Sequence, residues 1–249
     1  MRFAKQLAAA LLLPLCLLPL DVAGKGKREL PPKYEKPPFS LMSLSIGAPN
    51  DGWQLRPIAL KPRNYLKVKQ GSASRVYGHP ALVKMLYRTS RDIARSVPGS
   101  VMLVGDLSSK SGGPLSGHHS HQSGRDADLA FYAKDAKGKS VKLDRFVAFG
   151  GDGKAKDRSG LVFDDYRNWL LVQSWLKDHR AGISFIFISR PLRKRLLAYA
   201  AGHPAFKRHV KEAAALMREP ARAEAHDDHF HVRISCPKRQ DEICREHPR

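Results

Sequence analysis

The fold prediction starts from one stretch near the end of the chain, His226-Asp227-Asp228-His229-Phe230-His231-Val232-Arg233-Ile234. From His229 onward, polar and apolar residues alternate, which predicts a β-strand with residues 229, 231 and 233 on one face. Phe230 and Val232 then point to the opposite face and pack into a core. Two imidazoles, from His229 and His231, therefore project together from the polar face of this strand.

A second polar motif lies a hundred residues upstream: Gly117-His118-His119-Ser120-His121-Gln122-Ser123-Gly124-Arg125-Asp126-Ala127-Asp128. Gly124 lets the backbone turn between His121 and a strand predicted from Asp126 to Tyr132. If the two motifs meet, His121, Asp128 and His231 supply three metal ligands. Catalytic zinc uses three protein ligands and keeps a fourth position open. Asp126 shares a strand face with Asp128 and competes with it as the ligand.

Strands and helices alternate irregularly along the rest of the chain. Short apolar runs predict strands within 43–60, 65–68, 101–104 and 183–188, and apolar spacing predicts helices from His79-Pro80 to Pro98 and over 164–179, 191–201 and 204–217. Glycine-rich and polar stretches at 107–117 and 150–160 predict long loops. We therefore expect an α+β fold in which a small antiparallel sheet carries the site, flanked by helices and long loops.

The N-terminus has the pattern of a signal peptide over residues 1–24. Arg2 and Lys5 precede an apolar run, and Val22-Ala23-Gly24 offers a cleavage site. The run is short and contains prolines, so we expect no stable membrane span once it is removed; a retained N-terminal anchor is the alternative. Residues 25–42 predict an extended Lys/Pro-rich arm, and residues 43–249 a single domain in the periplasm or secreted from the cell.

The net charge indicates which kinds of partner the protein binds, and the cysteines predict a covalent cross-link. The formal net charge of +21 favours acidic partners. Export argues against nucleic acid, whereas the free carboxylates of peptidoglycan stem peptides fit. Cys236 and Cys244, the two cysteines after the signal, predict a disulfide, with metal ligation as the alternative. Arg190 and Arg193 are candidates for pairing with a substrate carboxylate, but a solvated surface is the better interpretation.

At this point the chain resembles the penicillin-insensitive murein endopeptidases, relatives of the lysostaphin-type and D-Ala-D-Ala metallopeptidases. The resemblance covers most of residues 60–245 and is carried by Tyr77-Gly78-His79-Pro80, Leu103-Val104-Gly105-Asp106-Leu107, the two histidine motifs and the residues up to Pro237. It implies one Zn²⁺ per chain, held by His121, Asp128 and His231. It also implies that the enzyme cleaves the D-alanyl to meso-diaminopimelyl cross-link of peptidoglycan.

The resemblance further implies roles for the other histidines. His229 is the expected general base, His226 lies near the attacking water and the tetrahedral intermediate, and His118 belongs to the outer shell or to an alternative metal arrangement. Two other functions stay open: a zinc D,D-carboxypeptidase, and a non-catalytic wall-binding module with structural zinc. The chain departs from the family in having fewer cysteines than expected and in its strongly basic N-terminal arm.

Overall fold

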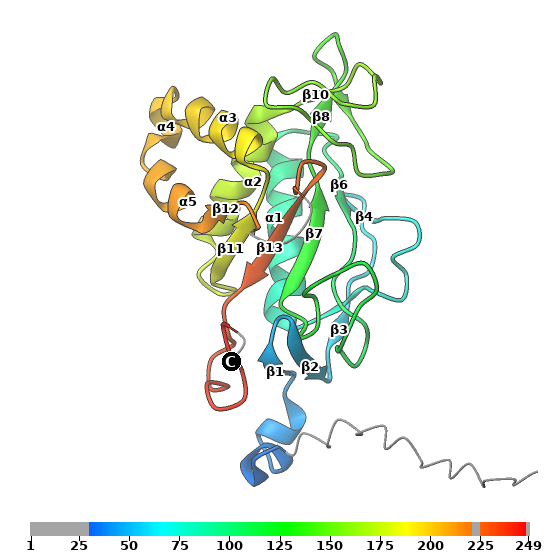
Figure 1. Ribbon diagram of the computed structural model, residues 1–249, viewed down its shortest axis with the longest axis vertical. Coiled ribbons are helices and arrows are strands. Elements are labelled where there is room, and N and C mark those ends of the chain that lie inside the picture. The colour runs from blue at the N-terminus through cyan, green and yellow to red at the C-terminus, as the bar shows by residue number, and fades with distance from the viewer. Residues whose placement is uncertain (1–29, 221–224, 248–249) are drawn as a thin grey trace, which may run out of the picture.

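A six-stranded mixed sheet forms the centre of the protein, whose structure, a computed structural model, describes residues 30–220 and 225–247. Its strand order is β12-β11-β13-β7-β6-β4 (Figure 1). The strands are β4 (Leu66–Val68), β6 (Met102–Val104), β7 (Asp126–Ala130), β11 (Ile183–Phe187), β12 (Met217–Arg218) and β13 (His229–Ile234). The α+β fold class is thereby confirmed, and the antiparallel pair β7–β13 lies at the middle of this sheet.

Short strands and helices surround the central sheet. The remaining strands are β1 (Leu44–Ala48), β2 (Asp51–Leu55), β3 (Ile58–Ala59), β5 (Tyr77–Gly78), β8 (Ala133–Lys134), β9 (Ser140–Val141) and β10 (Val162–Phe163). The α-helices are α1 (Pro80–Ser96), α2 (Asp165–Lys177), α3 (Arg190–Ala201), α4 (Pro204–Lys207) and α5 (Val210–Leu216). The helix expected over 204–217 is thus two short helices followed by strand β12.

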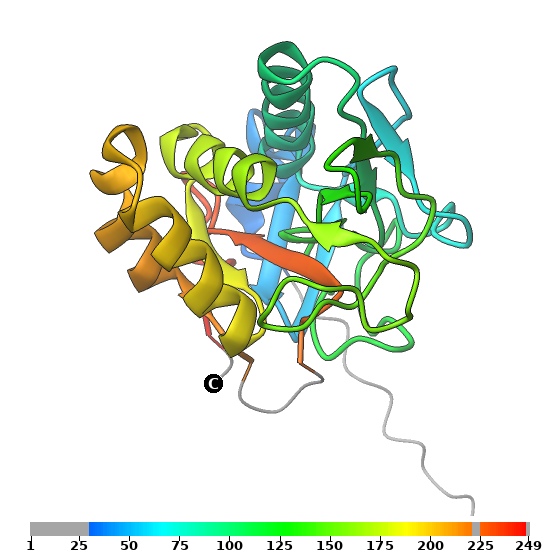
Figure 2. The same cartoon turned by 90° about the horizontal axis from the view of Figure 1, so that it is seen from above.

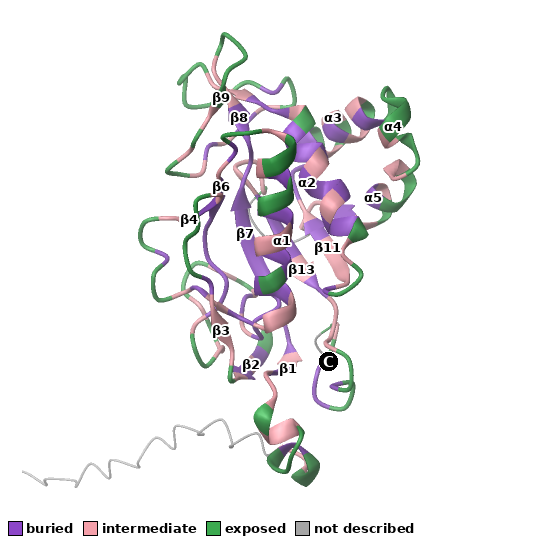
Figure 3. Cartoon of the chain, turned by 180° about the vertical axis from the view of Figure 1, so that it is seen from behind, coloured by how far each residue is buried: buried purple, intermediate pink, exposed green. Residues whose placement is uncertain are grey.

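Helices cover one face of the central sheet and leave the other face to the polar motifs. Seen from behind, α1 and α2 lie in front of the sheet (Figure 3), and the view from above places these two helices on one side of β13 (Figure 2). Phe230 and Val232 of β13 point to this side and are fully buried with Leu129 of β7. Burying such side chains contributes roughly 1.5–3 kcal/mol each and fixes which face of β13 looks outward.

The register of β7 and β13 fixes which polar residues meet. His231 lies opposite Asp128, and Arg233 lies opposite Asp126. Directly opposed residues of an antiparallel pair have side chains on the same face. The pairing therefore brings the two sequence motifs together, as the alternating pattern predicts.

The first described residues are more structured than expected. Two 3-10 turns, η1 (Pro32–Glu35) and η2 (Phe39–Leu41), replace the extended arm predicted for this part of residues 25–42. The reason is one aromatic side chain: Tyr34 is buried in a small cluster with Leu44 and Ile243. The predicted signal peptide, residues 1–24, lies outside the described residues. None of the helices in the described ranges has the length and apolar content needed to cross a bilayer.

The C-terminal segment is fastened to the rest of the domain. The predicted disulfide between Cys236 and Cys244 is present. Arg125, the residue before β7, has a fully buried guanidinium that donates to the carbonyl oxygen of Ile234 and to the carboxylate of Glu246. These contacts hold the segment after β13 beside the open face of the sheet.

Candidate metal centre

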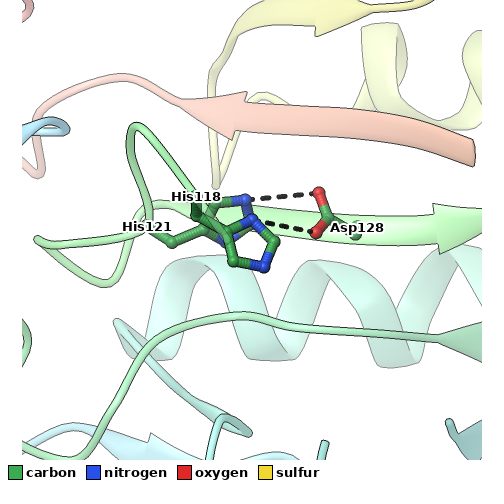
Figure 4. A group of neighbouring side chains, drawn as sticks. All are labelled: His118, His121 and Asp128. Atoms are coloured by element: carbon green, nitrogen blue, oxygen red, sulfur yellow. Dashed lines mark ion pairs between the residues drawn. The ribbon is translucent and has the colours of Figure 1, made fainter. Parts of the chain in front are cut away.

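Four histidines converge on one carboxylate at the open face of the sheet. Asp128 comes from β7, and His229 and His231 come from β13. His118 and His121 reach towards Asp128 from the loop that precedes β7 (Figure 4). All five side chains line a cleft of about 820 Å³.

The conformation of the loop before β7 places His121 beside the carboxylate of Asp128. The backbone of His121 has φ of 66°, an uncommon value for a residue other than glycine, and Gly124 follows with φ of 72°. Nδ1 of His121 lies 2.6 Å from the carbonyl oxygen of Leu107. Because a carbonyl only accepts, Nδ1 carries the hydrogen, and Nε2 presents its lone pair. That Nε2 lies 3.3 Å from Oδ1 of Asp128.

His231 is oriented in the same manner from the opposite strand. Its Nε2 lies 2.7 Å from Oδ1 of Asp126, whose pKa is lowered below its ordinary range: burial opposes the shift, but the charge of Arg233 and the bond to His231 outweigh it. The ionised carboxylate accepts, so Nε2 donates and Nδ1 is left with its lone pair. Nδ1 faces Oδ1 of Asp128 at 3.8 Å. A carboxylate behind a histidine is the usual outer partner of a metal-binding imidazole.

His118 and His229 repeat the arrangement with their own carboxylates. Nε2 of His118 lies 2.9 Å from Asp106, and its Nδ1 faces Asp128 at 3.7 Å. Nδ1 of His229 lies 2.5 Å from Asp228, and its Nε2 faces Asp128 at 3.5 Å. All four imidazoles therefore have one nitrogen bonded outward and the other directed at Asp128.

Two inner atoms lack any hydrogen bond within the described residues. They are Nε2 of His121 and Oδ1 of Asp128, and both are buried. Leaving such groups unsatisfied costs about 1–3 kcal/mol each, which a bound cation would offset. The ligand atoms of His118, His121 and Asp128 all lie within 4.8 Å of one another. Nitrogen and carboxylate donors suit zinc, so the residues fit the expected ion.

The protonation states of His231 and Asp128 agree with a ligand role, whereas in the metal-free protein the charge of Asp128 outweighs burial and raises the pKa of His121. Burial is the main reason that the pKa of His231 falls to about 4, only partly offset by Asp126. This imidazole is therefore neutral at pH 7, as a metal ligand must be. Burial would raise the pKa of Asp128, but the neighbouring charges of His121 and His229 hold it well below its ordinary range. Asp128 therefore stays ionised.

His229 differs from the other histidines. Burial opposes its protonation, but the charge of Asp128, together with the hydrogen bond to Asp228 and the charge of Asp228, outweighs it and raises the pKa to about 10. Its ring also stacks on Phe146, with centroids 5.0 Å apart and planes inclined by 20°. A carboxylate and an aromatic ring thus hold His229 in one orientation beside Asp128.

The remaining predicted residues lie around this centre or outside it. Nε2 of His226 lies 3.4 Å from Nδ1 of His231, so His226 borders the inner ligand atoms. Oδ1 of Asp126 is hydrogen-bonded to Nε2 of His231, so Asp126 is the outer partner of this imidazole. Arg190 forms an exposed ion pair with Glu219, and Arg193 donates to backbone carbonyls.

Three contributors to the site escaped the sequence interpretation. Asp106 stands in one of the family motifs, and Asp228 is adjacent to His229, so position in the chain could have suggested both. Phe146 has no such signal, because it lies in an irregular segment between β9 and β10. It reaches the site only because Gly105 leaves space: a Cβ there would lie 2.6 Å from the tip of the Phe146 ring.

Comparison with known proteins agrees with this geometry. A family profile described as penicillin-insensitive murein endopeptidase matches residues 45–249. The chain belongs to this family. A protein named penicillin-insensitive murein endopeptidase from Haemophilus influenzae is 27% identical over 230 residues, covering 88% of this chain and 70% of the relative.

Relatives of the same name show similar levels of identity. The protein from Pectobacterium atrosepticum is 29% identical over 78% of this chain and 65% of its own length. One from Escherichia coli is 26% identical over 70% of this chain and 59% of its own length. The chain thus spans about two thirds of the length of these relatives, and the family resemblance inferred from the motifs is confirmed.

Proposed function

We propose that this protein is a zinc metalloendopeptidase that hydrolyses D-alanyl-meso-diaminopimelyl cross-links of peptidoglycan in the periplasm or after secretion. The observation that carries the proposal is the orientation of the histidines. Hydrogen bonds on their outer nitrogens fix the tautomers, and the inner nitrogens face the buried carboxylate of Asp128. Histidines with a packing role alone would not need hydrogen bonds that direct their second nitrogens at one carboxylate.

His121, Asp128 and His231 are the proposed zinc ligands. His231 is preferred to His118 because its inner nitrogen belongs to a buried ring with a depressed pKa, whereas the His118 side chain is 20% exposed. His118 then lies in the outer shell or provides an alternative arrangement. When bound, a divalent zinc ion polarises the scissile carbonyl and lowers the pKa of water towards 7.

His229 is the proposed general base. Asp228 bonds Nδ1, so Nε2 is the atom that accepts a proton from the attacking water and delivers it to the leaving amine. A base must be neutral before it acts, and the charge of Asp128 opposes this in the free protein. A cation held by Asp128 would offset that charge and so lower the pKa of His229 towards the working range.

His226 is the proposed oxyanion-binding residue. Its ring centroid lies 4.7 Å from that of His229 and 5.4 Å from that of His231, at the edge of the cleft. From there its N–H can donate to the oxygen that becomes negatively charged as the carbonyl carbon turns tetrahedral. A well-placed donor of this kind contributes about 3 kcal/mol to lowering the barrier.

The test combines metal analysis with cleavage of a defined substrate. Purified protein is stripped with a chelator, reloaded with zinc, and incubated with cross-linked muropeptide dimers, and mass spectrometry detects the products. We expect monomers from the reloaded protein and none from the stripped protein. Free D-alanine without monomers would identify a D,D-carboxypeptidase, and binding without any product would identify a wall-binding module.

Variants separate the ligands from the base. His121→Ala and His231→Ala should lose both stoichiometric zinc and cleavage, whereas His229→Gln should keep the zinc and lose turnover by at least about 100-fold. His118→Ala decides between the two ligand sets, because it should retain the metal if His231 is the third ligand. Full activity of the metal-free protein would refute the scheme.

A further inference from the structure

The cleft extends beyond the metal centre along β13, where Arg233 follows His231 on the same face. Arg233 and Phe187 both line the cleft together with the histidines. Nε of Arg233 donates to Oδ1 of Asp126 at 2.6 Å, the same oxygen that bonds Nε2 of His231. A single carboxylate oxygen therefore ties the guanidinium to a proposed zinc ligand.

The guanidinium of Arg233 is held in one orientation, but only one of its three nitrogens has a hydrogen-bond partner among the described residues. Its carbon lies 5.4 Å from the centre of the Phe187 ring, and that ring also packs edge-on against His231 at 5.0 Å. Within the described part of the chain, Nε makes the single hydrogen bond of this side chain, and neither terminal nitrogen has a partner. Arginine presents its donors as a planar fork that matches a carboxylate. Two donors of a fixed fork thus remain for a ligand.

Other charges near the fork are already paired. Glu246 lines the same cleft, but its carboxylate accepts from the buried guanidinium of Arg125 at 3.0 Å and from the backbone N–H of Cys236 at 2.6 Å. A substrate carboxylate that enters the cleft therefore meets the two unpaired nitrogens of Arg233. The negative charge of Glu246 does not repel it strongly, because Arg125 offsets that charge. The net charge of +21 adds a long-range attraction for anionic substrates.

We propose that Arg233, supported by Phe187, binds the free carboxylate of the residue on the leaving side of the scissile amide. This inference rests on the proposed function and adds a specificity determinant to it. In a D-alanyl-meso-diaminopimelyl link, the carbon that bears the acylated nitrogen also bears a carboxylate. That carboxylate is two bonds from the scissile nitrogen, and the bridge through Asp126 places the Arg233 fork correspondingly close to the proposed ligand His231.

The experiment compares two synthetic cross-linked dimers that differ at this one group, either a free carboxylate or a carboxamide. With zinc-loaded protein, kcat/KM for the acid should exceed that for the amide by about 10- to 100-fold, as expected for hydrogen bonds to a charged group. Arg233→Gln should reduce the ratio to near one. Arg218→Gln is the matched control: Arg218 is an exposed arginine over the Phe185 ring, on β12 of the same sheet, two strands from β13 and outside the cleft lining. It should leave the ratio unchanged.

A purely structural role of Arg233, as counterion of Asp126, predicts another result. Arg233→Gln would then slow cleavage of both dimers equally and keep the ratio, which would overturn the proposal. So would a wild-type protein that does not distinguish the dimers, a result that needs no variant to fold. If zinc-loaded protein cleaves neither dimer, the proposed function fails. Calorimetric binding of the two uncleaved dimers then decides the subsite, since tighter binding of the acid by wild type but not by Arg233→Gln would support it and equal binding would refute it.

Discussion

Replacing Gly124 by alanine tests whether the loop before β7 positions the metal centre. The substitution destabilises the protein in two ways that can be measured separately, through backbone strain and through steric overlap. The backbone has φ of 72°, and the Cβ of an alanine would lie 1.9 Å from Oε1 of Gln54 and 3.2 Å from the backbone nitrogen of His79. The left-handed conformation alone costs roughly 1–2 kcal/mol for an L-residue. The steric overlap adds to it.

The overlap is expensive because Gln54 cannot move away freely. Its side chain is buried, at 2% exposure, and donates to the carbonyl oxygen of Ser109 at 2.7 Å. Displacing it breaks that bond and leaves a buried polar group unsatisfied, which costs about 1–3 kcal/mol. We therefore expect Gly124→Ala to lower the free energy of unfolding by about 2–5 kcal/mol and to weaken zinc binding, since His121 and Asp128 flank the displaced turn.

Gly99→Ala is the matched control. Gly99 has φ of 82°, but nothing lies within 4 Å of its Cβ position. Urea denaturation of both variants should show a loss of only about 1–2 kcal/mol for Gly99→Ala, and the difference between the variants measures the overlap with Gln54. If Gly124→Ala destabilises the protein no more than Gly99→Ala does and binds zinc normally, the proposed link between this turn and the site is wrong.

Two further predictions concern stability. Burial would raise the pKa of Asp178, but bidentate hydrogen bonds from Arg88 outweigh it and lower the pKa below its ordinary value of 3.8. The stabilisation is therefore complete above that value and is lost as the pH falls below it, so denaturation curves of wild type and Asp178→Asn should differ by about 1.5 kcal/mol at pH 7 and converge at lower pH. Cys236→Ser together with Cys244→Ser should cost about 2.5 kcal/mol, and a reductant should abolish the difference from wild type.

The strand that carries the site could be predicted because its two faces differ so clearly. Phe230 and Val232 alternate with His229 and His231, so only one orientation of the strand packs the apolar pair into the core and turns the imidazoles towards the other face of the sheet. Once that orientation is fixed, the pairing with β7 follows from the second motif. The helices starting after His79 and Asp164 were predictable for a similar local reason, since both residues cap the helix with a side-chain acceptor.

Elements that depend on distant contacts could not be predicted in this way. The first described residues fold into turns because Tyr34 finds Leu44 and Ile243, and Ile243 lies about two hundred positions along the chain. Strand β12, two residues long, exists because Met217 pairs with Ile186 of β11. No local pattern encodes either contact, since tertiary packing rather than propensity decides them.

The same division applies within the site. A histidine in a sequence motif can be recognised as a potential ligand, but its tautomer depends on what bonds the outer nitrogen. For His121 that partner is a backbone carbonyl, that of Leu107, which carries no side-chain signal at all. For His229, orientation depends on Phe146, whose ring fits only because residue 105 is glycine. The sequence therefore predicts which groups can bind a metal, whereas the fold determines which nitrogen of each imidazole faces it, and activity requires both.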